Sequence, residues 1–161
     1  MLILNSGGTF NKRYNAINGS LEVPFDNTAV EKILQSVHAE YSLAGAVYKD
    51  SLEIDANDRA LLANIIRESD ETHFIIIHGT DTMLTSADFF DEVFEDKIII
   101  FTGAMKPYEI DKVEASLNLG MALGFCKATK EVGVYICMNG FIEQCHNIQK
   151  NKTKGKFEIV R

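Results

Sequence analysis

Short apolar runs alternate along the chain with segments of helical periodicity. The apolar runs are rich in isoleucine and valine, and they cover residues 2–4, 46–48, 74–77, 98–101 and 132–138. Continuous runs of this kind are typical of parallel strands that are covered on both faces. We therefore expect five buried strands in one sheet.

Apolar stripes that repeat every three or four residues separate these strands and predict helices. The stripes comprise Val30, Ile33, Leu34 and Val37; Leu61, Leu62, Ile65 and Ile66; Phe90, Val93 and Phe94; and a weaker set, Leu117, Met121 and Phe125, interrupted by glycines. A capping box of Thr28 and Glu31 is expected at the first helix, and Asp55 is the expected cap of the second.

The alternation predicts one α/β domain over residues 1–161, with a doubly wound, mostly parallel sheet of the flavodoxin or Rossmann type. Ligands of such sheets bind beyond the carboxyl ends of the strands, where the strand order reverses. Polar and glycine-rich segments follow the first four strands, at residues 5–9, 50–51, 78–81 and 102–105. A functional site is therefore expected at that edge of the sheet.

Residues 9–24 form a long polar stretch without a clear period, and they include Tyr14 and Gly19. Loops of more than about 12–15 residues within a compact domain are usually functional. We expect this segment to be a mobile active-site lid or a hairpin rather than a linker between domains.

Composition narrows the range of ligands. The chain has 161 residues, of which 46% are hydrophobic and 24% are charged, so it is long enough to bury one core. Its formal net charge of -7 would repel nucleic acid and anionic membrane surfaces. The expected ligand is a small neutral or zwitterionic molecule, with no nucleic-acid or membrane partner. Of the four lysines near the C-terminus, all except Lys150 are interpreted as a solvated basic cluster.

No metal or organic cofactor is expected. Cys126, Cys137 and Cys145 are odd in number and form no CxxC pair, which argues against a disulfide framework or a zinc site. The histidines have no second ligand at a fixed spacing, and we interpret them as structural. Because the chain opens on a short apolar run and a glycine pair, without the pattern of a signal peptide, we expect a cytoplasmic protein.

Two turns carry the chemistry. The SGGT loop at residues 6–9 lacks the remainder of a dinucleotide fingerprint and the lysine of a P-loop, so a flavodoxin-like nucleotide binder is poorly supported. Taken alone, this loop could be a tight turn, or its glycines could free backbone N–H groups beside the Thr9 hydroxyl. The HGTDTM segment at residues 78–83 is more specific, because a helix cap would explain one of its hydroxyl or carboxylate side chains but not all of them.

Together these turns resemble those of the bacterial-type L-asparaginases, whose first strand ends in TGGT and whose third ends in HGTDTM. The resemblance extends to TGAMKP at residues 102–107, which is similar to the family's GAMRP, and to residues 134–139, which are similar to its VxVMN strand. It runs the length of this chain but covers only the N-terminal half of the family, whose smaller second domain has no counterpart here.

The resemblance implies that the chain hydrolyses L-asparagine to L-aspartate and ammonia through a covalent acyl-enzyme, with L-glutamine left open as a second substrate. Thr9 matches the threonine that attacks the side-chain amide, and Tyr14 is the candidate for its tyrosine partner. Thr80, Asp81 and Lys150 match a second constellation, in which a lysine helps to deprotonate a threonine. An alcohol is a weak nucleophile at neutral pH and needs such a base.

Substrate binding is expected to involve Ser51, which matches the serine that holds the α-carboxylate, together with Gly8, Thr80, Asp81 and Ala104. Asp81 is expected to orient the lysine and to receive the substrate α-amino group. Backbone N–H groups near Gly8 and Thr80 are expected to bind the oxyanion.

Three departures from the family bear on binding. Leu52 stands where the family has a glutamine that contacts the α-amino group, Ser6 replaces the first threonine of TGGT, and the second domain is missing. These departures predict weaker substrate binding, and they leave open a second hypothesis, that of a non-catalytic module that binds an amino acid or amide. Surface that relatives bury against the second domain predicts a homodimer or homotetramer.

Overall fold

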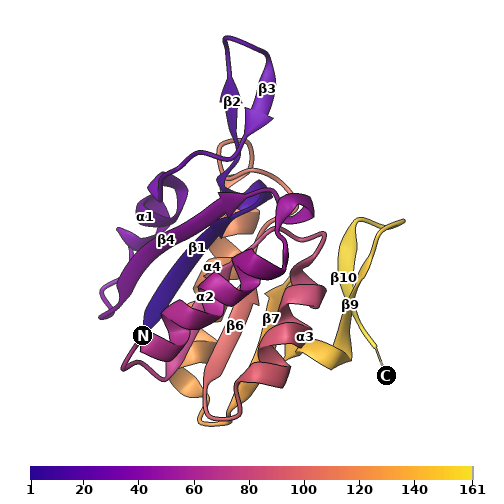
Figure 1. Cartoon of the computed structure of the whole chain (residues 1–161). Coiled ribbons are helices and arrows are strands. Elements are labelled where there is room, and N and C mark those ends of the chain that lie inside the picture. Colours follow the sequence, from indigo (N-terminus) through magenta and orange to yellow (C-terminus); the bar gives the residue numbers. More distant parts are fainter. Residues whose placement is uncertain (161) are drawn as a thin grey trace.

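The computed structural model of the chain describes residues 1–160 and is built around a six-stranded sheet in the order β4-β1-β5-β6-β7-β8 (Figure 1). The first five strands in that order are parallel, and β8 is antiparallel to β7. The strands are β1 (Leu2–Gly7), β4 (Ser42–Lys49), β5 (His73–Ile77), β6 (Ile98–Thr102), β7 (Gly133–Met138) and β8 (Phe141–Gln144).

Helices cover both faces of the sheet, as the strand pattern predicts. On one face α1 (Thr28–Leu34) and α4 (Lys112–Ala128) pack over one apolar cluster, and on the other face α2 (Ala56–Glu68) and α3 (Met83–Val93) pack over a second. The chain runs from β1 to β4 on one side and then returns past β1 to β5, so the strand order reverses between β1 and β5. The doubly wound fold is thereby confirmed. No helix within residues 1–160 is long and apolar enough to cross a membrane.

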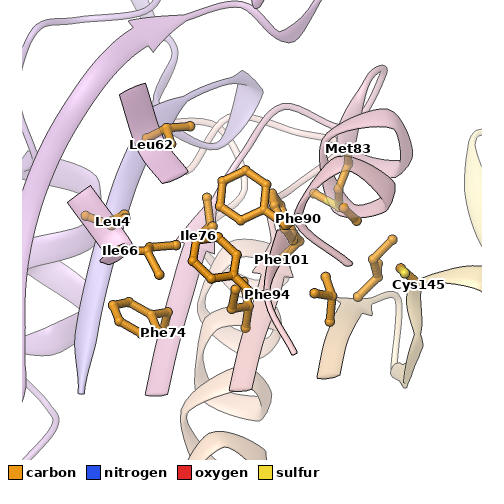
Figure 2. Close-up of a cluster of buried hydrophobic side chains, with 14 of the residues drawn as sticks. Leu4, Leu62, Ile66, Phe74, Ile76, Met83, Phe90, Phe94, Phe101 and Cys145 are labelled. Atoms are coloured by element: carbon orange, nitrogen blue, oxygen red, sulfur yellow. The ribbon is translucent and has the colours of Figure 1, made fainter. Parts of the chain in front are cut away.

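The cluster under α2 and α3 is rich in phenylalanine (Figure 2). Phe90 of α3 packs edge-to-face on Phe101 of β6, with ring centroids 5.4 Å apart, and lies beside Phe94. Leu62 and Ile66 bring α2 to the same cluster. Each fully buried side chain of this size contributes roughly 1.5–3 kcal/mol, so this layer holds the two helices that follow β4 and β5 firmly in place.

The apolar stripe predicted for α4 is only partly right, because Met121 and Phe125 pack at the edge of the apolar cluster but Leu117 does not. Leu117 is 61% exposed, and the face against the sheet is instead formed by Ala115, Asn118, Leu119, Ala122, Leu123 and Cys126. The buried face combines two leucines with small residues, which allow a helix to approach a sheet closely, so the size of an apolar residue alone did not identify this face.

One of the two predicted helix caps is confirmed. Asp55 accepts hydrogen bonds from the backbone of α2, and Asp58 completes a capping box with it. The box predicted for Thr28 and Glu31 is wrong, because Thr28 already belongs to α1 and Asn27 occupies the cap position. The side chain of Asn27 is engaged elsewhere, since its oxygen accepts hydrogen bonds from Asn5 and from the Tyr48 hydroxyl.

Two hairpins lie outside the central sheet. The segment 9–24 contains a short 3-10 helix, η1 (Thr9–Asn11), and the hairpin of β2 (Arg13–Asn15) and β3 (Ser20–Glu22), which confirms the hairpin expectation. The hairpin of β9 (Ile148–Asn151) and β10 (Lys156–Ile159) was not predicted, because its short strands carry a polar, lysine-rich pattern. Two further 3-10 helices, η2 (Ser51–Glu53) and η3 (Cys145–Asn147), occupy turns.

Candidate active site

Three turns meet at the carboxyl edge of the sheet, where the strand order reverses, and glycine makes their approach possible. A Cβ on Gly8, whose φ is +74°, would lie 2.4 Å from the Cα of Gly79, and a Cβ on Gly79 would lie 2.6 Å from the Ser51 side chain. No other residue type could fill these positions without displacing backbone. Thr9 and Thr80 each follow one of the two glycines directly, so the contact fixes where both hydroxyl residues begin.

Thr80, Asp81 and Lys150 form one hydrogen-bonded cluster, in agreement with the sequence. The Lys150 Nζ donates to Thr80 Oγ1 and to Asp81 Oδ1, both at 2.7 Å. Thr80 is buried and the Lys150 side chain is 9% exposed, whereas the Asp81 side chain is 42% exposed. The lysine and the hydroxyl are thus largely shielded from solvent, while the carboxylate keeps a face on which an external cation could bind.

Ser51 lies against the same turn and is buried. Its Oγ accepts a hydrogen bond of 3.2 Å from the Asp81 backbone N–H, and its carbonyl accepts one of 2.6 Å from the Thr82 hydroxyl. Leu52, the next residue, is 74% exposed and has no polar group to offer. Ser51 is therefore held beside Asp81, and Leu52 leaves its side of the site apolar.

Asp50 provides a second carboxylate at this edge. Its side chain caps η2 through the Leu52 N–H and forms an ion pair of 2.6 Å with Lys12. Burial alone would raise the pKa of Asp50, but the Lys12 and Leu52 hydrogen bonds and the charges of Lys12 and Lys150 outweigh it and lower that pKa. Asp50 thus remains ionised near Lys150 and adds to the negative charge around the lysine.

A buried amide pair, which sequence reasoning missed, holds the SGGT turn. Asn5 and Asn11 exchange side-chain hydrogen bonds of 3.0 and 2.8 Å, and Asn11 also donates to the Gly7 carbonyl at 2.6 Å. Ser6 joins this turn to the neighbouring strand by donating to the Ile77 carbonyl at 2.7 Å. An asparagine at the end of an otherwise apolar strand was the available signal, because a buried amide requires partners.

His78 is structural, as expected, but its role is specific. It is fully buried, its Nδ1 lies 2.8 Å from the Gly79 carbonyl, and its Nε2 lies 2.9 Å from Ser86 Oγ, which accepts from Arg59. Because a carbonyl only accepts, Nδ1 carries the proton, and the Ser86 hydroxyl donates to Nε2. Burial, assisted by the Arg59 charge, lowers the pKa of His78 to about 4 despite the Gly79 hydrogen bond. A neutral imidazole therefore fixes the peptide between Gly79 and Thr80.

The fourth predicted turn, at residues 102–105, follows β6 and is held by two side chains of α4. Asn118 donates to the Gly103 carbonyl at 2.9 Å and so anchors this turn to α4. Glu114 accepts from the backbone N–H groups of Met105 and Lys106. Ala104 is buried between these anchors and belongs to the apolar cluster under α4. Its expected contact with substrate remains a prediction.

Tyr14 lies apart from the cluster around Thr80. It is in β2 of the first hairpin and is 60% exposed, with its backbone N–H donating to Glu109 Oε2 at 2.7 Å. Within residues 1–160 no hydrogen bond joins Tyr14 to Thr9. The Gly8 N–H donates to the Lys49 carbonyl at 2.8 Å, so an oxyanion donor near Gly8 would have to be a neighbouring N–H group.

The chain is thus an α/β protein with hydroxyl, carboxylate and ammonium groups at the switch point of a doubly wound sheet, which is where such folds bind their ligands. The family model described as "Asparaginase, N-terminal" matches residues 1–158, and the chain belongs to this asparaginase family.

Individual relatives agree with this assignment. The chain is 25% identical to the glutaminase-asparaginase of Acinetobacter glutaminasificans, with 93% of this chain and 49% of the relative aligned. It is 29% identical to L-asparaginase 2 of Escherichia coli (strain K12), with 94% and 46% aligned. The chain thus spans about half the length of the curated relatives it matches. Its fold is similar to that of the thermostable L-asparaginase from Thermococcus kodakarensis, with a TM-score of 0.84 at 19% identity, over 99% of this chain and 50% of the other.

Proposed function

We propose that the chain is a threonine-dependent amidohydrolase that converts L-asparagine to L-aspartate and ammonia without a cofactor. The observation that carries this proposal is the contact of the Lys150 Nζ with both Thr80 Oγ1 and Asp81 Oδ1 at 2.7 Å. A module that only bound an amino acid would use the carboxylate and the hydroxyl, but it would have no need of a buried lysine on the hydroxyl.

Thr9 is the proposed nucleophile. Its Oγ forms a bond to the side-chain amide carbon, the amide nitrogen leaves as ammonia with the transferred proton, and water then cleaves the resulting ester to give aspartate and to restore the hydroxyl. Lys150, as the free amine, is the proposed proton acceptor. Thr80 would relay to its Nζ, along the existing contact, the proton that the Thr9 hydroxyl loses, and the leaving amide nitrogen would then take up that proton.

The surroundings of the cluster suggest how the substrate would be held. The N–H groups of Thr9 and Thr80 are the proposed oxyanion donors, since that of Gly8 is occupied, and each such donor is worth roughly 3 kcal/mol of barrier. The buried Ser51 would bind the α-carboxylate, and the exposed face of Asp81 would bind the α-amino group. With Leu52 beside them, this ammonium has fewer polar contacts, so we expect a high KM.

The first test is ammonia release from L-asparagine, D-asparagine and L-glutamine by the purified chain. Thr9→Val keeps the shape of the side chain but removes the nucleophile, so turnover should fall by several orders of magnitude while aspartate still binds. Thr153→Val, at an exposed position in the β9–β10 hairpin, is the matched control and should leave turnover unchanged. Aspartate binding by calorimetry with no ammonia release would instead identify a binding module.

Two wider properties belong to the same proposal. We expect a homodimer or homotetramer, because Ile17, Phe25 and Leu52 are 98%, 84% and 74% exposed, and the last two border a hollow of about 600 Å³ beneath the first hairpin. Light scattering that showed only an 18.0 kDa species at micromolar concentration would contradict this.

A cytoplasmic location likewise stays a prediction, since one relative, from Haemophilus influenzae, is described as a probable periplasmic L-asparaginase.

A further inference from the structure

A second group of reactive side chains lies outside the site described above. Asp91 belongs to the last turns of α3, and Cys145 and His146 belong to η3. A carboxylate oxygen of Asp91, the Cys145 Sγ and a ring nitrogen of His146 all lie within 4.8 Å of one another. Figure 2 shows Cys145 at the margin of the core cluster to which α3 contributes Met83 and Phe90.

The three donor types together suit one class of ion. Thiolate, imidazole and carboxylate are the ligands that Zn²⁺ takes, in tetrahedral geometry. With bonds of about 2.0–2.3 Å, the ligand atoms of such a site lie about 3.3–3.8 Å apart. Asp91 and His146 are exposed, so their side chains can rotate inward towards the buried sulfur. We propose that Asp91, Cys145 and His146 bind one Zn²⁺ ion, with water in the fourth position.

The electrostatics of the group are consistent with a cation. Asp88 lies one helical turn before Asp91, and its pKa is raised by burial and by the charges of Asp91 and Glu92, with His146 acting in the opposite direction. Asp88 and Asp91 both lie close enough to act on the Cys145 thiol by their charge, and a divalent ion would neutralise that negative charge. On binding, the Cys145 S–H proton leaves to solvent as the S–Zn bond forms, with no change of oxidation state.

The other cysteines show that this arrangement is not a general property of the buried thiols. Cys137 donates to the Asn118 carbonyl, and Cys126 is packed among apolar side chains under α4. Within residues 1–160, no other three histidine, cysteine or acidic side chains approach one another as closely. This makes Cys126 and Cys137 internal references for a thiol without a metal.

The proposed ion would connect two segments that matter for the active site, although the metal proposal does not depend on the proposed function. The α3 helix follows the turn that bears Thr80 and Asp81, and η3 leads into β9, which bears Lys150. A bond between α3 and η3 through the ion would limit the separation of these segments. Zinc should therefore raise the thermal midpoint of unfolding, because it binds the folded chain and not the dispersed ligands of the unfolded one.

The test uses the full chain, freed of metal and titrated with ZnCl₂ and with CoCl₂. We expect native mass spectrometry to show one ion per chain, calorimetry to show release of one proton, and the cobalt form to absorb at the wavelengths of thiolate-to-cobalt charge transfer. Absence of that absorption, or of stoichiometric binding, would overturn the proposal.

Variants identify the ligands. His146→Ala and Asp91→Asn should each weaken zinc binding by more than the roughly 10–100-fold that is typical of losing an outer-shell partner. Cys145→Ser should also abolish the cobalt absorption, while Cys126→Ser and His38→Ala serve as controls and should bind zinc normally. Because Cys145 is buried and its replacement could affect folding, the exposed residues Asp91 and His146 decide the matter. Unchanged affinity in both of their variants would overturn the site.

Discussion

The β2–β3 and β9–β10 hairpins both lie outside the central sheet, and each carries a residue that the family resemblance assigns to catalysis. They differ in how they are attached. Phe157 of β10 is fully buried in the cluster under α3, and its N–H donates to the Asn139 side chain at 2.9 Å. The β3 strand, in contrast, is exposed at every position.

The difference has a physical consequence for the two functional residues. Few buried contacts give a segment a low free energy of local opening, and an anchored segment opens only with the surrounding core. Lys150 on the anchored hairpin is therefore preorganised against Thr80, whereas Tyr14 on the exposed hairpin would reach Thr9 only if that hairpin moves. We infer that the site has one fixed half and one adjustable half.

The largest expected effect concerns the fixed half. Lys150→Met keeps most of the apolar stem but removes the proton acceptor, so turnover should fall by the ~10²–10⁴-fold that general-base assistance typically provides. Lys154→Met is the matched control, since Lys154 belongs to the same hairpin but pairs only with Glu158 and is 59% exposed. Steady-state rates on L-asparagine measure both variants. A Lys150→Met variant with normal turnover would show that the anchored lysine has no part in the chemistry.

The next-largest effect concerns how firmly each hairpin is attached to the rest of the domain. Phe157→Ala removes a fully buried ring and should lower the free energy of unfolding by about 3–5 kcal/mol. Leu21→Ala, at a 43% exposed position in β3, should change that free energy by no more than about 0.5 kcal/mol. Urea denaturation of both variants would compare the hairpins directly, and equal losses would show that the first hairpin is as firmly anchored as the second.

A third prediction concerns pH and the turn that precedes Thr80. The unfolded chain binds a proton at His78 near pH 6.5, but the folded chain does so only near pH 4. Above pH 6.5 both states are neutral, and as the pH falls to 4 the free energy of unfolding should drop by about 3 kcal/mol through this residue. Denaturation curves of wild type and His78→Gln at pH 7 and 4.5 isolate this contribution. Identical pH dependence of the two proteins would contradict it.

The smallest expected effect concerns the adjustable half. Bound aspartate should slow amide exchange in β2 and β3 by roughly tenfold, which corresponds to about 1.4 kcal/mol, because a closing lid gains contacts with the ligand. Exchange in β9 and β10 should change less. Tyr14→Phe should reduce turnover without changing stability, since the side chain is 60% exposed. If exchange in the first hairpin were the same with and without aspartate, that hairpin would not act as a lid.

Much of the fold was predictable from the sequence, because buried parallel strands leave continuous apolar runs whose positions need no tertiary information. The apolar pattern did not predict the features that depend on tertiary packing. Leu117 was assigned to the buried face of α4, but it is exposed, and Leu119 and Leu123 face the sheet together with alanines and Asn118. The β9–β10 hairpin was missed because only Ile148 and Phe157, one in each strand, are buried in the core, and single buried residues make no periodic pattern.

For the site, the sequence by itself determined the identity of the groups, since the SGGT and HGTDTM turns and Lys150 could be named from their family resemblance. Only the tertiary structure decided how they meet. The contact of Gly8 with Gly79, the amide pair of Asn5 and Asn11, and the grouping of Asp91 with η3 all join segments from different strands or helices. Such contacts depend on strand order and on close packing in three dimensions, and neither is written in the local spacing of residues along the chain.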